Sequence, residues 1–135
     1  MDLRELSIKL ADHEVEGVGF ESFLIDSDEQ EVLQVVVEGN DELPVFVTRT
    51  DEQILCISFL FNKTEVKDGA AAEVNEKMLE LNVPVPLSAF SIIADKYAIF
   101  GALSVDSSFD DIAHELVTLS DNAIDALEAF EPFLQ

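Results

Sequence analysis

Hydrophobic and polar positions along the chain change their spacing several times, and each change predicts a new element of secondary structure. Near the start, Leu3, Leu6 and Leu10 recur at the spacing of one helical face. Asp2 precedes them in the position of a helix cap, so we expect a helix from there to about His13. Two glycines soon afterwards favour a break before the next element.

Four apolar runs then follow, each rich in β-branched and aromatic residues and bounded by polar turns. The expected strands are 18–25, 32–37, 43–48 and 54–61. Because the connections are short, we expect neighbouring strands to pair antiparallel in the order of a meander. The run from 32 to 37 is almost continuously apolar, which is typical of a central strand.

The second half of the chain predicts a helix, a hairpin and a longer helix. The helix spans Ala70 to Asn82, and the hairpin joins 89–94 to 97–105 about the polar pair Asp95-Lys96. The last helix begins at Ser108, and its apolar positions are spaced by three and four residues. These positions are Phe109, Ile112, Leu116, Leu119, Ala123, Ala126 and Phe130.

Together these elements predict an α+β fold in which helices flank an antiparallel sheet, in the order α-β-β-β-(β)-α-β-β-α. No repeat or linker interrupts the pattern, so we expect a single domain over 1–135. Most of the apolar seam on the last helix must pack across the sheet. Its regularity also favours a surplus face that pairs with a second copy, and we therefore expect a homodimer.

Charge narrows the classes of partner. Acidic residues outnumber basic ones by 29 to 7, for a formal net charge of −22. This excludes a nucleic-acid binder, which needs Lys and Arg on phosphates, and argues against anionic membrane surfaces. No apolar run is long enough for membrane insertion, and no signal peptide begins the chain, so we expect a cytoplasmic protein. A basic or helical protein partner suits this charge, although the acids could also serve only solubility.

The last helix concentrates the negative charge. No Lys or Arg follows Lys96, while carboxylates continue to the end of the chain. A helix with one apolar face and several exposed acids suits a cationic partner. The candidate partner-binding residues are Asp110, Asp111, Glu115, Asp121, Asp125 and Glu128.

Few residues in the sequence are suited to catalysis or to binding a metal ion. His13 and His114 are the only histidines, and neither accompanies a nucleophile in a recognisable arrangement. Cys56 lies in an apolar run and is expected to be buried and inert, and one cysteine cannot build a zinc site. We therefore expect no enzyme, no cofactor and no dedicated metal site.

Two polar or irregular segments leave alternatives open. The acidic stretch 26–31 could attract calcium, although it lacks the glycine and glutamate spacing of a helix-loop-helix calcium loop. The alternative function is accordingly a small-molecule or calcium-binding regulatory domain that uses acidic turns. The segment 83–87 contains two prolines and forms either a structural connection or an exposed extended edge.

The segment Met78-Leu79-Glu80-Leu81-Asn82, the hairpin from Phe90 to Val105 and the helix at Phe109 together resemble the type III secretion chaperone-like fold, which YbjN-like domains share. Within that group the chain is similar to the YjfI-like bacterial family. The resemblance implies a dimeric, acidic escort that holds a partner segment on apolar patches. Because genes of that family tend to neighbour those of phage-shock-protein-A-like membrane-remodelling proteins, it also implies a helical, charged partner of that kind. No residue signature carries a binding site over to this chain.

Overall fold

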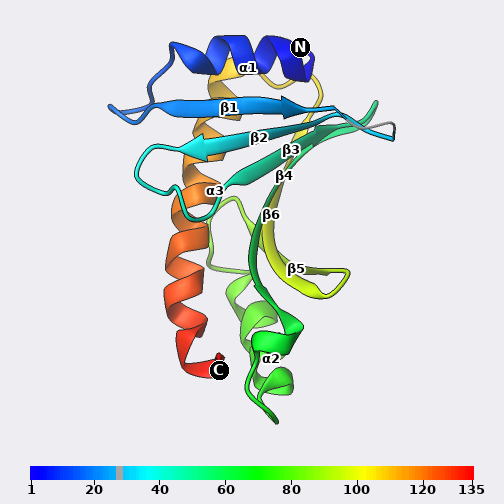
Figure 1. The fold of residues 1–135 in the computed structure, drawn as a ribbon, viewed down its shortest axis with the longest axis vertical. Helices are drawn as coiled ribbons and strands as arrows, with labels where there is room; N and C mark the ends of the chain where they lie inside the picture. The colour runs from blue at the N-terminus through cyan, green and yellow to red at the C-terminus, as the bar shows by residue number, and fades with distance from the viewer. Residues whose placement is uncertain (27–28) are drawn as a thin grey trace.

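An antiparallel sheet of six strands forms the centre of the computed structural model, in the order β1-β2-β3-β4-β6-β5 (Figure 1). The structure describes residues 1–26 and 29–135. Its helices are α1 (Leu3–Ala11), α2 (Ala71–Leu81) and α3 (Phe109–Phe130), with short 3-10 turns η1 (Lys63–Glu65) and η2 (Glu131–Phe133). Its strands are β1 (Phe20–Ile25), β2 (Val32–Val37), β3 (Val45–Arg49), β4 (Gln53–Asn62), β5 (Ala89–Ile93) and β6 (Lys96–Ser104).

The predicted fold class and element order are confirmed. The first four strands pair as the expected meander, and β2 lies between β1 and β3 as its apolar run predicted. The hairpin of β5 and β6 joins the sheet through β6, which pairs with β4 along nine residues. This leaves β5 at the edge of the sheet, a position that the sequence pattern did not specify.

Helix α1 packs on the sheet through the three leucines that its pattern predicted, and all three are buried. The Asp2 side chain accepts a hydrogen bond from the Glu5 backbone at 2.8 Å, which caps the first turn. The hydroxyls of Ser7 and Ser22 lie 2.8 Å apart and join the helix to β1. The helix ends at Ala11 with Asp12 as its C-cap, and Glu16 and Gly17 then turn the chain through positive φ angles.

Helix α3 crosses the same face of the sheet, passing behind β1 and β2 in the view of Figure 1. Six positions of its seam are at most 6% exposed, namely Ile112, Leu116, Leu119, Ala123, Ala126 and Phe130. Phe109, Val117, Ile124 and Leu127 also pack against the core. The expectation of a surplus apolar face on this helix is therefore wrong, because the sheet and its neighbouring loops use the whole stripe.

Helix α2 packs at the far end of this face, close to the C-terminal part of α3. The Tyr97 hydroxyl donates to Asn75 Oδ1 at 2.7 Å and links β6 to the helix. Lys77 donates to the carbonyl of Ala129 at 3.2 Å and lies 5.1 Å from the ring centroid of Phe130. A lysine of α2 thus contacts the end of α3, which has no basic residue in its own last turn.

Candidate protein-binding surfaces

The face of the sheet opposite α1 and α3 carries a row of side chains that runs across all six strands. Each member pairs with the next in the ladder, so their side chains share one face. The row is Phe23, Gln34, Phe46, Ile57, Phe100 and Ala89. It lies outside the hydrophobic core, and among the described residues no helix packs over it. We call this surface the open sheet face.

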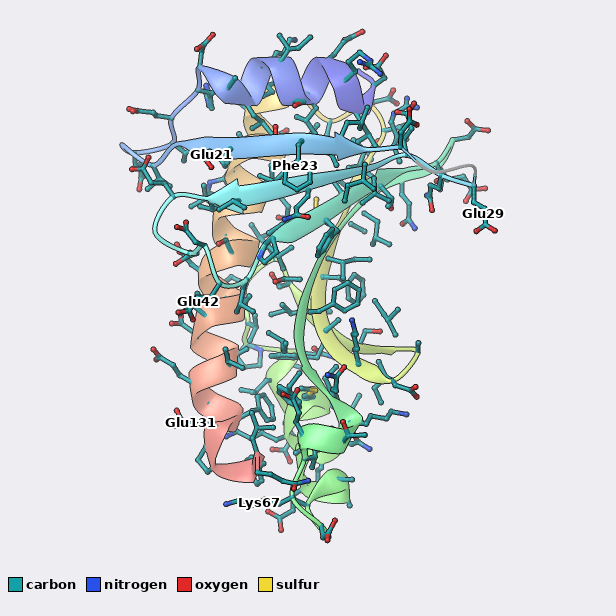
Figure 2. All side chains as sticks on the ribbon, in the orientation of Figure 1. Glu21, Phe23, Glu29, Glu42, Lys67 and Glu131 are labelled. Carbon is teal, nitrogen blue, oxygen red and sulfur yellow. The ribbon has the colours of Figure 1, made fainter. Side chains whose placement is uncertain are left out.

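Aromatic and aliphatic side chains dominate the open sheet face. Phe23 and Ile25 are 53% and 38% exposed, which is high for large apolar residues. Figure 2 shows Phe23 on the near side of β1, with α3 passing behind the strand. The rings of Phe46 and Phe59 lie 5.8 Å apart, so neighbouring side chains partly shield one another. Contiguous apolar surface of this kind marks an interaction site.

Charges of opposite sign flank the open sheet face. An acidic hollow of about 710 Å³ lies at its β1–β2 corner and shares Val36 with it. Five carboxylates line this hollow, from Asp12, Glu14, Glu21, Glu38 and Asp41. On the other side, the amino group of Lys96 lies 5.1 Å from the centroid of the Phe59 ring. The face is therefore apolar in its middle, acidic at one corner and basic at another.

Five of the six candidate carboxylates on α3 are exposed, namely Asp110, Asp111, Asp121, Asp125 and Glu128. One of them has a local partner, since Asp121 accepts a hydrogen bond from Asn40 at 3.0 Å. The exposed acids form a solvated surface on the side of α3 that faces away from the sheet. The structure does not bring them together with the open sheet face, which lies on the opposite side of the sheet.

The sixth candidate, Glu115, is only 5% exposed and points toward the sheet. A Cβ atom built on Gly101 of β6 would collide with its Oε1 and lie 3.0 Å from its Cδ. The glycine therefore provides the space that the carboxylate occupies. A carboxylate in this position cannot reach a partner, so the assignment of Glu115 to an exposed binding surface is corrected.

Burial shifts the pKa values of two side chains in this region, Glu115 and Cys56. Desolvation by burial raises the pKa of Glu115 above 4.5, and the electrostatic influence of neighbouring His114 acts in the opposite direction. Cys56 pairs with Gly101 across the ladder, and burial together with the Glu115 charge raises the pKa of its thiol to about 12. The expectation of a buried cysteine is confirmed, and a thiol with this pKa is a poor nucleophile at neutral pH.

A second set of exposed apolar side chains lies on α2, the proline-containing segment and β5. Leu79, Val83, Leu87 and Ile92 are 71%, 89%, 61% and 45% exposed, and a hollow of about 310 Å³ lies between α2 and β5. The segment 83–87 connects the two elements and is held by Asn122, whose amide donates to the carbonyl of Pro86 at 2.9 Å. It pairs with no strand, so of the two alternatives it serves as a structural connection.

The two histidines have different surroundings. His13 packs its ring edge-on against Phe109 at 4.7 Å, and His114 is exposed on α3. Residues 1–26 and 29–135 contain no group of three His, Cys, Asp or Glu residues that could hold a metal ion. The acidic stretch proposed for calcium includes residues 27 and 28, which lie outside the described part of the chain. Within that part, no helix has the length and hydropathy of a membrane span.

Solved structures with the same architecture place the fold among α+β proteins of the secretion-chaperone-like class. YbjN from E. coli matches with a TM-score of 0.66 and 15% identity, over 98% of this chain and 91% of that one. The ExoU–SpcU heterodimer from the type III secretion system of Pseudomonas aeruginosa matches with a TM-score of 0.55 and 13% identity, over 82% of this chain and 84% of that one. The HopA1–SchA chaperone–effector complex matches with a TM-score of 0.57 and 12% identity, over 95% and 98%.

The chain belongs to the family described as an uncharacterized protein conserved in bacteria (DUF2170), whose model matches residues 1–134. It is 30% identical to the protein YjfI of Escherichia coli K12 over 105 residues, which cover 73% of this chain and 77% of that protein. The resemblance that the sequence pattern predicted is confirmed for both the family and the fold.

Proposed function

We propose that this protein is a non-catalytic protein-binding module, either chaperone-like or an adaptor. The observation that carries the proposal is the open sheet face, because an apolar face across six strands is costly to leave in water. Sheets of this kind bury both faces or leave a polar one in solvent, and this chain does neither. A partner that covers the face accounts for its composition.

Fold similarity supports the same role without defining the partner. One similar structure is a chaperone–effector complex and another is a heterodimer from a secretion system. We propose that the protein acts in the cytoplasm and holds a segment of another protein, a role that this likeness supports. A phage-shock-protein-A-like membrane-remodelling protein, which is helical and charged, is the partner that we propose from the family resemblance.

The exposed carboxylates of α3 have a separate role in this proposal. Asp110, Asp111, Asp121, Asp125 and Glu128 add to the negative field of a chain with net charge −22. Such a field accelerates encounter with a basic partner and is weakened by salt, because the screening length at physiological ionic strength is about 8 Å. We therefore assign these residues to steering and the open sheet face to docking.

Self-association has its own candidate surface. Helix α2 lies at the opposite end of the fold from α1 (Figure 1). Leu79 of α2 and Ile92 of β5 are exposed and line the hollow between these two elements, and we propose this hollow as the contact of a homodimer. Light scattering on the wild type and on a Leu79→Glu variant tests this. A monomer in both proteins at all concentrations would contradict it.

Affinity purification followed by mass spectrometry tests the proposed function. Tagged protein is incubated with a bacterial lysate at low and high salt, and a charge-matched acidic domain serves as the control bait. We expect a specific protein that is retained at low salt and released at high salt. If the control bait retains the same proteins as this chain, the binding function is refuted.

A further inference from the structure

The length, backbone pairing and charge of the open sheet face favour one kind of bound protein segment. This inference rests on the proposed protein-binding function. The row from Phe23 to Ala89 crosses six strands, and their five intervals of about 4.8 Å span about 24 Å. At a rise of about 1.5 Å per residue, about 16 residues of α-helix cover that length. The other face of the same sheet is already covered by a helix, α3, of 22 residues.

Backbone hydrogen bonding favours a helix over an extended segment. The backbone groups of β2, β3 and β4 are engaged by strands on both sides, so the face offers only side chains to a ligand. An extended segment lying on this face would leave its own N–H and C=O groups without partners once water is excluded. A helix satisfies its backbone internally and presents an apolar stripe, as α3 does on the opposite face.

The charges around the open sheet face determine which residues suit each end of the bound helix. The acidic hollow, lined by Asp12, Glu14, Glu21, Glu38 and Asp41, adjoins the β1–β2 corner of the face. A helix end placed over this corner needs Lys or Arg, because like charges would repel it. The opposite direction along the face reaches Lys96 over Phe59, which tolerates an acidic residue on the partner.

A second copy of this chain does not fit these requirements. The apolar stripes of α1 and α3 are buried against their own sheet, and α3 contains no Lys or Arg. Two copies placed face to face would bring two open sheet faces together, and neither would supply a helix with a basic end. The complementary surface must come from another protein.

We propose that the open sheet face binds an amphipathic α-helix of a partner protein, with its apolar stripe across Phe23, Phe46, Ile57 and Phe100 and its basic end over the acidic hollow. The sheet then lies between two helical layers, one from each protein. The partner helix supplies the third layer of a sandwich whose first two layers belong to this chain.

A designed peptide tests the proposal directly. The probe is a fluorescein-labelled helix of about 16 residues, with Leu along one face and Lys and Arg gathered at one end. Three matched probes contain Glu in place of the bases, a shuffled order that breaks the stripe, or prolines that keep the peptide extended. Fluorescence anisotropy with the full chain measures Kd for each. We expect saturable binding of the first probe only, weakened by salt.

Variants of the face locate the binding. The double variant Phe23→Thr/Phe46→Thr keeps residues suited to strands while removing two rings, and should raise Kd about tenfold or more. Ile8→Thr, which removes an apolar side chain 68% exposed on α1, is the matched control and should leave Kd unchanged. Circular dichroism establishes that the double variant is folded. The single variant Phe23→Thr, at an exposed edge position, provides the comparison if it is not.

Several results would overturn the proposal. These are equal binding by the double variant and the wild type, equal binding of the shuffled, extended or anionic probe, and a salt-independent dimer in sedimentation that the double variant dissolves. If a specific lysate protein is retained equally by wild type and double variant, this inference fails while the binding function stands. If neither retains any specific protein and no probe binds, both fail.

Discussion

The carboxylate of Glu115 on α3 occupies the space that a side chain at Gly101 on β6 would fill. A side chain at Gly101 would therefore require the Glu115 carboxylate to shift, and its Cβ atom would also lie 3.3 Å from the backbone oxygen of Leu87. The arrangement also accounts for a glycine in the middle of a long strand, a position where glycine otherwise weakens a sheet.

Replacing Gly101 with alanine should destabilise the protein by about 1–3 kcal/mol, because the added methyl group overpacks the contact with Glu115. Chemical denaturation monitored by circular dichroism measures the loss. The double variant Gly101→Ala/Glu115→Ala should recover a large part of the stability lost by Gly101→Ala alone, because the two atoms that collide are no longer both present. A double variant less stable than Gly101→Ala would argue against this contact.

The pH dependence of stability should change when Glu115 is replaced by glutamine. Burial raises the pKa of this carboxyl in the folded protein, so the folded state holds the proton more tightly than the unfolded state. Its contribution to stability is then complete below the unfolded pKa and is lost as pH rises through the folded pKa. Glu115→Gln should therefore match wild type at acidic pH and exceed it at neutral pH. A constant difference between the two unfolding curves across this range would contradict the assignment.

Cys56 should resist alkylation in the folded protein. Burial and the nearby Glu115 charge hold its thiol pKa at about 12, so almost no thiolate exists at neutral pH. Iodoacetamide labelling followed by mass spectrometry should proceed only in denaturant, where the whole chain is modified. Rapid labelling of the native protein at pH 8 would show that this part of the sheet opens.

Charge reversal at the two ends of α3 should change the stability of the fold in opposite directions while it changes partner association in the same direction. Glu128→Lys places a cation near the helix C-terminus, where it interacts favourably with the helix dipole, and should stabilise the fold by about 0.3–1 kcal/mol. Asp110→Lys places the same charge in the first turn and should destabilise it by a similar amount.

Both charge reversals should slow association with a basic partner peptide, because each makes the net charge of the chain less negative by the same amount. Thermal unfolding and stopped-flow binding measure the two quantities on the same samples. If the association rates of the two variants differ as their stabilities do, and not as their net charges predict, the steering role of these carboxylates is refuted.

The fold was predictable from the sequence because its local patterns agree with one another. Helical spacing at Leu3, Leu6 and Leu10 and the seam of α3 located those helices, and short polar turns located the strands of the meander. The pairing of β4 with β6 was not predictable, because nothing in a local pattern specifies which hairpin strand joins a distant strand.

The candidate site was predicted less well than the fold. The acids of α3 were expected to form one surface, but helical position alone could not identify Glu115 as facing Gly101, a residue of another element. The open sheet face left a signal that was present in the sequence. Runs such as Val32–Val37 and the segment of β4 are apolar on both sides, and a single layer of helices covers only one of them.

The two apolar faces of this sheet have a consequence for how its strands find their register. In a sheet with one polar face, a slip of one residue exposes the core and is opposed by hydrophobicity. Here a strand that slips by one residue would replace the apolar side chains on the core face with other apolar side chains, so hydrophobicity opposes the slip only weakly. Correct alignment then depends on a few polar and steric features that recognise only one alignment, such as the Ser7–Ser22 contact, the irregularity between Phe59 and Phe61, and the fit of Glu115 over Gly101. Because the binding face is apolar, the register of the strands depends on these few specific contacts more than on hydrophobic burial.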